Sequence, residues 1–346
     1  MVEPLAKRHL RERRPATEKT VSSQYFMRSP KTRKVEDESE HEETASQSPK
    51  SRQRQGVLAF TNGQLLTKKP LVNPVSRDDA GRKTLAEVAE ETWTLLPGLL
   101  ATRPDVKLDS FLCRKETLDP ARCPRLKPTK VRVVDADTID AALALQREYD
   151  TPVAVLNMAN ANRAGGGWQH GALAQEEAMC YRSSLIKTLH RKHYPIPEDA
   201  AIYSPSVMII RDNMKSGHNL LDFRDPSQLD MISVISCAAV CQPFLQKDNK
   251  GRQNYRDQED VKLMKEKIRV VLRTAIRNKH RQLVLGALGC GAFGNPNHAV
   301  AVMFKVILQE SEFQGGYWED LVFAVLDGSR DSNFKVFQAE LDGLVV

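Results

Sequence analysis

Of all the motifs in this sequence, three glycines followed by two adjacent carboxylates are best suited to chemistry by residue type and spacing. Gly165–Gly167 follow an apolar run at 153–156 that predicts a buried strand, and Gln175–Glu177 open the next helical pattern. Successive glycines are entropically costly, so a close approach by another group must require them. A strand, a glycine-rich loop and acids at a helix start form a unit that can hold a phosphate-bearing ligand beside an acid.

The two glutamates cannot have the same role if a helix begins at this point. Consecutive helical residues point about 100° apart, and the positive end of the helix dipole favours the anionic forms of both carboxyls. Asn157 and Asn160 flank the strand exit, where side-chain amides can hold ribose hydroxyls. The alternative is that the glutamates are a capping pair of surface acids, which many helices have.

A second glycine loop contains Gly289, Gly291 and Gly294 in the dinucleotide-binding spacing, between a predicted strand and a predicted helix. A Rossmann fold is excluded, because only one further strand follows and no acid lies at a second strand end within about 20 residues. What the loop keeps is the ability to bind a diphosphate through backbone amides at a helix start. A tight turn without a ligand is the alternative.

The apolar strands alternate with amphipathic helices, which is typical of a largely parallel sheet covered on both faces. Ligands bind at the carboxyl ends of such strands, and both glycine loops leave carboxyl ends. The segment 101–130 is predicted to be loop-rich and 247–257 to be a surface loop. The predicted strands are 131–134, 153–156, 201–203, 207–210, 231–236, 282–287 and 321–326, and the predicted helices are 84–96, 137–146, 175–191, 259–278 and 297–309.

The length of 346 residues indicates one domain with extensions. We expect a disordered charged tail at 1–75, a helical and loop-rich accessory segment at 76–130 and the core at 131–346. No apolar run approaches the roughly 18 residues of a membrane span, and no secretory signal is expected at the start. The six cysteines are scattered and are interpreted as reduced thiols, without a zinc site.

The net charge of +7 and the pI of about 9.0 favour a polyanionic partner. The basic cluster at 7–14 is interpreted as a nuclear import signal, a nucleic-acid contact or merely a solvated tail. Nucleic acid is therefore expected only through the tail, no membrane partner is expected, and the localisation is expected to be intracellular, in the nucleus, the cytoplasm or both.

These motifs together resemble the signature of poly(ADP-ribose) glycohydrolases, in which a triple glycine lies a few residues before Gln-Glu-Glu. Here seven residues separate Gly165–Gly167 from Gln175–Glu177. The Asn-Met-Ala-Asn at 157–160 is similar to the Asn-x-x-Asn of macrodomains, and 289–295 looks like their diphosphate loop. The resemblance covers about residues 80–340, without the tail, and is to the compact bacterial-type branch that also occurs in fungi.

The resemblance implies a three-layer α/β/α macrodomain with a largely parallel or mixed sheet and an N-terminal helical extension. It implies hydrolysis of the ribose–ribose O-glycosidic bonds of poly(ADP-ribose), releasing ADP-ribose without a metal or redox cofactor. Glu177 would be the catalytic acid/base, and Glu176 would orient ribose hydroxyls. The substrate-binding positions carried over are Asn157, Asn160, Gly165, Gly166, Gly167, Gln175, Gly289, Gly291, Ala292, Phe293, Gly294 and Asn295.

Within this set, Asn160 would hold the distal ribose, and the diphosphate would lie on Gly166, Gly167 and the amides of 291–293. Two alternatives stay open. One is a reader that binds ADP-ribose or poly(ADP-ribose) without cleaving it, against which the acid at Glu177 argues. The other is a hydrolase of mono-ADP-ribosyl groups on proteins, which would make ADP-ribosylated proteins partners as well.

Overall fold

The computed structural model describes residues 60–61, 64–65, 79–149, 151–328 and 332–346. The basic cluster of the predicted tail lies outside these residues. Inside the tail, β1 (Phe60–Thr61) and β2 (Gln64–Leu65) form a short antiparallel pair, and the predicted disorder of the tail stays a prediction. No helix in the described ranges has both the length and the apolar character needed to cross a bilayer.

The centre of the fold is a seven-stranded mixed sheet with the strand order β3-β6-β7-β5-β10-β11-β4. The five strands from β7 to β4 are parallel to one another, whereas β6 and β3 are antiparallel to their neighbours. The strands are β3 (Phe111–Arg114), β4 (Arg132–Val134), β5 (Ala154–Met158), β6 (Ala200–Met208), β7 (Met231–Cys237), β10 (Gln282–Leu285) and β11 (Asp320–Ala324).

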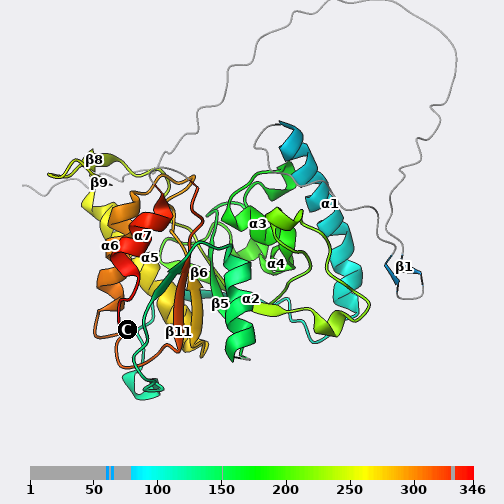
Figure 1. The fold of residues 1–346 in the computed structure, drawn as a ribbon, viewed down its shortest axis with the longest axis horizontal. Coiled ribbons are helices and arrows are strands. Elements are labelled where there is room, and N and C mark those ends of the chain that lie inside the picture. The colour runs from blue at the N-terminus through cyan, green and yellow to red at the C-terminus, as the bar shows by residue number, and fades with distance from the viewer. Residues whose placement is uncertain (1–59, 62–63, 66–78, 150, 329–331) are drawn as a thin grey trace, which may run out of the picture. The chain divides into compact units, whose positions relative to one another are not determined.

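Side chains of β5 and the residue before it alternate between two hydrophobic cores. Ala154 and Leu156 pack in the core with α5, α6 and α7, while Val153 and Val155 pack in the core with α1, α2 and α3. Figure 1 shows these helices on opposite faces of the sheet, which confirms the three-layer α/β/α fold. The helices are α1 (Asp79–Ala101), α2 (Thr138–Tyr149), α3 (Gln175–Arg182), α4 (Leu185–Thr188), α5 (Gln258–Arg277), α6 (Asn297–Leu308) and α7 (Asn333–Leu341).

The helix predicted to end before Pro97 continues through it to Ala101. A proline inside a helix costs about 3 kcal/mol. Leu96 and Leu99 are almost completely buried in a core that they share with Met208, and each buried leucine contributes roughly 1.5–3 kcal/mol. Burial of the leucines therefore offsets the cost of the proline, and the predicted helix end was wrong.

The single helix predicted from Gln175 to Arg191 is wrong, because α3 ends at Arg182 and a separate turn, α4, follows. The Ser183 hydroxyl donates to the Met179 carbonyl at 2.7 Å. Ser184 and Met208 exchange two hydrogen bonds, one from each backbone amide. Serines compete with helical hydrogen bonding in this way, and here they attach the end of α3 to the end of β6.

Two predicted interruptions are also corrected. The break expected around Ser204-Pro205 is a bulge within a continuous β6, where Pro205 has no amide to leave unpaired and its carbonyl accepts from the Ser233 hydroxyl at 2.8 Å. The surface loop expected at 247–257 contains a hairpin of β8 (Leu245–Lys247) and β9 (Gln253–Tyr255). The edge strand β3 and the helix α7 were not predicted, since both are short.

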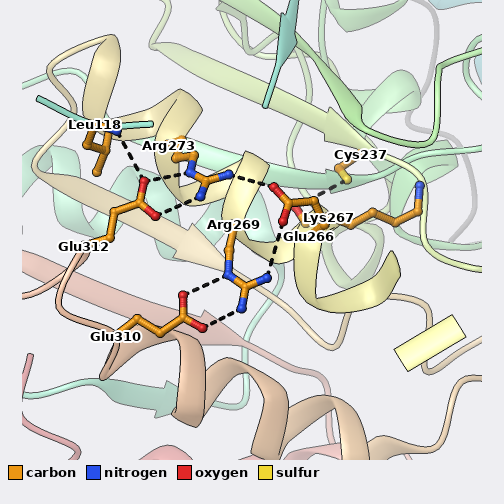
Figure 2. A network of polar contacts seen from close by, with 8 residues as sticks. All are labelled: Leu118, Cys237, Glu266, Lys267, Arg269, Arg273, Glu310 and Glu312. Atoms are coloured by element: carbon orange, nitrogen blue, oxygen red, sulfur yellow. Dashed lines mark hydrogen bonds and ion pairs between the residues drawn. The ribbon is translucent and has the colours of Figure 1, made fainter. Parts of the chain in front are cut away.

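A buried ionic network connects α5 to the segment after α6 (Figure 2). The Arg273 guanidinium donates to both oxygens of Glu312, at 2.7 and 2.8 Å, and to Glu266 at 2.7 Å. Arg269 pairs in the same two-pronged manner with Glu310. The hydrogen bond from Arg273 lowers the pKa of Glu312. Two-pronged Arg–carboxylate pairs fix the orientation of both groups, so α5 is held in one register against its neighbour.

We expect Arg273→Ala to destabilise the protein by about 3 kcal/mol, because it leaves Glu266 and Glu312 without their shared cation in a largely buried setting. The measurement is the free energy of unfolding from denaturant titration. Lys262→Ala, which breaks an exposed pair with Glu259 on the same helix, is the control and should cost less than about 1 kcal/mol. Equal losses in the two variants would contradict a structural role for the network.

Candidate functional site

The carboxyl ends of β5, β10 and β11 lie so close together that they bring the two glycine loops side by side. A Cβ on Gly286, just after β10, would lie 3.3 Å from the Met158 side chain at the end of β5 and 3.5 Å from the Ala324 carbonyl at the end of β11. The chain then continues from β5 into a catalytic loop, defined as residues 159–174, and from β10 into a diphosphate loop, defined as residues 287–296. The two loops predicted at this edge of the sheet therefore leave neighbouring strand ends.

Glu176 is buried beneath the catalytic loop, with only 3% of its surface exposed. Its carboxyl accepts hydrogen bonds from the Asn160 amide at 2.7 Å and the Gly165 amide at 3.2 Å. Its pKa is raised to about 8, chiefly by burial and also by the Glu177 carboxyl, while these backbone hydrogen bonds act in the opposite direction. Glu176 is thus protonated at neutral pH.

Glu177 lies closer to the surface, with 9% exposed, and both of its oxygens accept backbone hydrogen bonds. One bond comes from the Gly167 amide at 2.9 Å and the other from the Ala174 amide at 3.1 Å. Glu177 is the third residue of α3, and Ala174 is the residue just before the helix. The hydrogen bond between them is that of a capping box, so Glu177 does cap α3. The interpretation as a surface acid fails, however, because the loop covers it.

The glycines of the catalytic loop make room for the two carboxyls. A Cβ on Gly166 would overlap Oε1 of Glu177 and lie 3.2 Å from Oε2 of Glu176, and its φ of +56° is a left-handed conformation. The amides of this triplet are already used, since those of Gly165 and Gly167 bind the glutamates and that of Gly166 donates to the Arg163 carbonyl at 3.0 Å. The diphosphate donors predicted at Gly166 and Gly167 are therefore occupied within the protein.

Three of the predicted substrate-binding side chains support the catalytic loop from within. Asn157 is fully buried and donates to the Ser236 hydroxyl at 2.9 Å, so no ligand reaches it from solvent. Gln175 donates to the Leu156 carbonyl at 2.7 Å and accepts from the Met158 amide at 2.8 Å, which attaches the start of α3 to β5.

The third, Asn160, is partly exposed, and its side-chain oxygen accepts from the amides of Asn162 at 2.9 Å and Arg163 at 3.0 Å. These two bonds shape the turn at the start of the catalytic loop. They engage the side-chain oxygen of Asn160 within the protein. The contact between Asn160 and the distal ribose stays a prediction.

The diphosphate loop differs from the catalytic loop because its amide donors at 291–293 are not used by any residue that the structure describes. Within the described part of the chain, the amides of residues 291–293 donate no hydrogen bond to the protein. Gly291 and Ala292 are exposed and Phe293 is partly buried, and a Cβ at Gly291 would meet open space. Successive unpaired amides before the first turn of α6 are donors for an anion, as predicted from the sequence.

Two glycines and an asparagine set the shape of this loop. Gly289 and Gly294 adopt positive φ angles of +73° and +67°, and the amide of Gly294 closes a turn onto the Gly291 carbonyl at 2.9 Å. Asn295 is buried and donates to the Val240 carbonyl at 2.7 Å and the Gly289 carbonyl at 3.1 Å. Asn295 therefore supports the loop from within. It would act on a substrate only indirectly, through the shape of the loop, and not by the contact predicted for it.

The sequence did not reveal that α1 supports the catalytic loop. At Gly171 the loop touches α1 so closely that a Cβ would lie 2.6 Å from the Arg82 carbonyl carbon. Thr92, which is fully buried on α1, donates to the Tyr181 carbonyl at 3.0 Å. The Tyr181 hydroxyl in turn donates to the Ala172 carbonyl at 2.6 Å. The accessory helix and the catalytic loop therefore pack as one unit.

Comparison with known proteins places the chain in a family. Residues 120–212 match the family described as microbial-type PARG, catalytic domain. The structure of a mutant poly(ADP-ribose) glycohydrolase from Deinococcus radiodurans in complex with ADP-ribose is 30% identical, covers 72% of this chain and 98% of that chain, and gives a TM-score of 0.54. The chain belongs to the microbial-type poly(ADP-ribose) glycohydrolase family.

Two further structures agree with this family assignment. The poly(ADP-ribose) glycohydrolase from Thermomonospora curvata bound to the inhibitor ADP-HPD is 26% identical, with 74% of this chain and 99% of that chain covered and a TM-score of 0.57. Another structure of the glycohydrolase from the same organism is 24% identical, covers 75% and 100%, and gives a TM-score of 0.58, which supports the fold. No curated protein sequence matches the chain.

Membership of the glycohydrolase family confirms the resemblance inferred from the motifs, and the chain is an enzyme of the glycohydrolase class. The family match includes the whole catalytic loop and both glutamates. The diphosphate loop and α1 lie outside the matched residues, so their place in the site rests on the geometry described above. Among the described residues, no group of three or more His, Cys, Asp or Glu is arranged to hold a metal ion.

The raised pKa of Glu176 makes stability depend on pH in a defined direction. The unfolded chain loses this proton near the ordinary pKa of 4.5, whereas the folded protein keeps it up to about pH 8. The stabilisation of the folded state by the protonated Glu176 is therefore fully present below about pH 4.5 and is lost as the pH rises toward 8. We expect the melting temperature of the wild type to fall more steeply over this range than that of Glu176→Gln, which has no proton to lose.

The measurement is thermal unfolding of both proteins at intervals from about pH 5 to pH 8.5. Glu259→Gln, which removes an exposed carboxylate on α5, controls for the loss of one negative charge. Parallel curves for the wild type and Glu176→Gln would show that the buried carboxyl does not hold its proton.

Proposed function

We propose that this protein hydrolyses the ribose–ribose O-glycosidic bonds of poly(ADP-ribose) and releases ADP-ribose, with Glu177 as the general acid and base. The single observation that carries the proposal is the pairing of the two loops. A buried pair of carboxyls lies under one loop, and three free amides in succession lie on the neighbouring loop. A diphosphate bound to the amides of 291–293 brings an attached ribose next to the carboxyls.

Glu177 is the better candidate for the general acid because of its position. It is the more exposed carboxyl, and it lies at the glycine triplet, where a substrate can approach without a Cβ in the way. Glu176 lies deeper, and its oxygens are turned toward the amides of Asn160 and Gly165. Glu176 therefore acts as a positioning residue that holds the loop and orients ribose hydroxyls.

The pair of carboxyls begins the reaction with one proton, because burial opposes two negative charges so close together. In the free protein this proton lies on Glu176. When substrate binds, it passes to Glu177, which donates it to the departing ribose oxygen as the bond to the anomeric carbon breaks. The oxocarbenium-like centre that results is attacked by water, and Glu177 takes up the proton that the water loses. The carboxyl is regenerated, and the products are ADP-ribose and the remaining polymer.

We expect Glu177→Gln to lower kcat on poly(ADP-ribose) by about 10²–10⁴-fold, since it removes general acid catalysis. Its affinity for ADP-ribose should stay within a few-fold of the wild-type value. The measurement is release of ADP-ribose from labelled polymer by the purified proteins, with Glu259→Gln as the unaffected control. Tight binding of polymer without any release by the wild type would identify a reader instead.

The same assay distinguishes a poly(ADP-ribose) glycohydrolase from a mono-ADP-ribosyl hydrolase when a protein carrying a single ADP-ribose is the substrate. The proposal expects release from polymer to be faster by far than removal of the single protein-linked group. Efficient removal of single groups with slow polymer cleavage would identify a mono-ADP-ribosyl hydrolase. Full activity of Glu177→Gln on polymer would remove Glu177 from its role.

The glycine triplet gives a second test, because Gly166→Ala places a methyl group where Oε1 of Glu177 lies. We expect kcat to fall by on the order of 10²-fold, as misplacement by about 1 Å can cause such a loss. Gly343→Ala is the matched control, because Gly343 also has a positive φ, +77°, but open space around it. The two variants share the backbone strain, so equal activities would show that the triplet does not position Glu177.

A further inference from the structure

The hairpin of β8 and β9 is attached directly to the diphosphate loop. The Tyr255 hydroxyl donates to the Asn295 side-chain oxygen at 2.7 Å, and the Gln242 amide donates to the Phe293 carbonyl at 2.8 Å. Figure 1 shows β8 and β9 next to α6, the helix that follows the diphosphate loop. Any ligand that extends from the bound diphosphate along this side meets the hairpin.

One face of the hairpin carries a stacked aromatic and guanidinium pair. In the antiparallel register Leu245 pairs with Tyr255, so Phe244 lies opposite Arg256 on the other face. The Arg256 guanidinium lies 4.3 Å from the centre of the Phe244 ring, and the Arg256 amide donates to the Phe244 carbonyl at 2.8 Å. The pair is thus held by the backbone, yet Phe244 keeps 59% of its surface exposed.

Polar side chains extend this face along the two strands. Gln246 and Asn254 are paired across the hairpin and lie on the same side as Phe244, because side chains alternate along a strand. We call Phe244, Gln246, Asn254 and Arg256 the hairpin face. An exposed ring, a cation and two amides are groups that bind nucleotide bases by stacking and hydrogen bonding.

The hairpin is also positively charged. Residues 242–257 contain four basic and two acidic residues, a balance of +2. Arg252 pairs with Asp248, and Arg256 pairs with Asp257. Lys247 and Lys250 have no acidic partner among the described residues. Unpaired ammonium groups near the turn attract the phosphates of a polyanion.

We propose that the hairpin face binds the ADP-ribose unit of the polymer next to the one in the active site, with its adenine stacked on Phe244. This inference rests on the proposed function. The polymer repeats a base and a diphosphate, which matches a stacking ring followed by free cations. The continuity of the hairpin with the diphosphate loop favours this occupant over a second copy of the chain or a nucleic acid.

The test compares polymer with a substrate of one unit, an ADP-ribose that carries a small O-linked fluorescent group on its distal ribose. We expect Phe244→Ala to lower kcat/KM on long polymer by about 10-fold, mainly through KM, since one base stack is lost. Its kcat/KM on the one-unit substrate should be unchanged. Phe111→Ala, which removes an equally exposed aromatic on the edge strand β3, should change neither value.

A binding measurement keeps the two proposals apart. Phe244→Ala in a Glu177→Gln background should bind polymer about 10-fold more weakly but ADP-ribose with the same affinity, whether or not the wild type cleaves polymer. Equal losses on polymer and on ADP-ribose would show that the hairpin only braces the diphosphate loop. Unchanged polymer affinity, with weaker self-association or weaker binding of single-stranded DNA instead, would assign the face to another partner and overturn the proposal.

Discussion

The structure depends on keeping two carboxyl groups under one short loop. Removing an ionised carboxylate from water costs several kcal/mol unless hydrogen bonds replace the lost solvent. Here four backbone amides supply those bonds, and one of the two groups retains its proton. The loop must therefore fold back over the first turn of α3, and only glycine at position 166 leaves the space that the carboxyls occupy.

The two glycine loops differ in where their backbone amides are directed. In the catalytic loop the missing Cβ matters, because the carboxyls fill the place where a side chain would be. In the diphosphate loop a Cβ at Gly289 would lie 2.5 Å from the Ala239 and Asn295 side chains, and the amides of 291–293 donate no hydrogen bond within the described part of the chain. One loop thus directs its donors inward to its own acids, and the other directs them outward. A substrate between them meets an acid at one end and anion donors at the other.

Much of this arrangement could be predicted from the sequence because it depends on local signals. The glycine triplet, its spacing to Glu177 and the periodicity of α5 are properties of neighbouring residues. What could not be predicted depends on contacts between distant segments. The continuation of α1 through Pro97 requires the core around Met208, and the end of α3 at Ser183 requires β6. Asn157, Gln175 and Asn295 were assigned to the substrate, since their hydrogen bonds within the protein cannot be inferred from composition or spacing.

The contact between Gly171 and Arg82 shows that sequence similarity and cooperative folding have different boundaries in this protein. The family match begins at Pro120, whereas the helix on which the catalytic loop rests ends at Ala101. A polypeptide that began where the similarity begins would contain both glutamates and the triplet. It would nonetheless lack the surface that covers Trp168 and receives Gly171. A segment with no chemical group in the reaction can therefore change under evolution only in ways that preserve the shape of its contact with the loop.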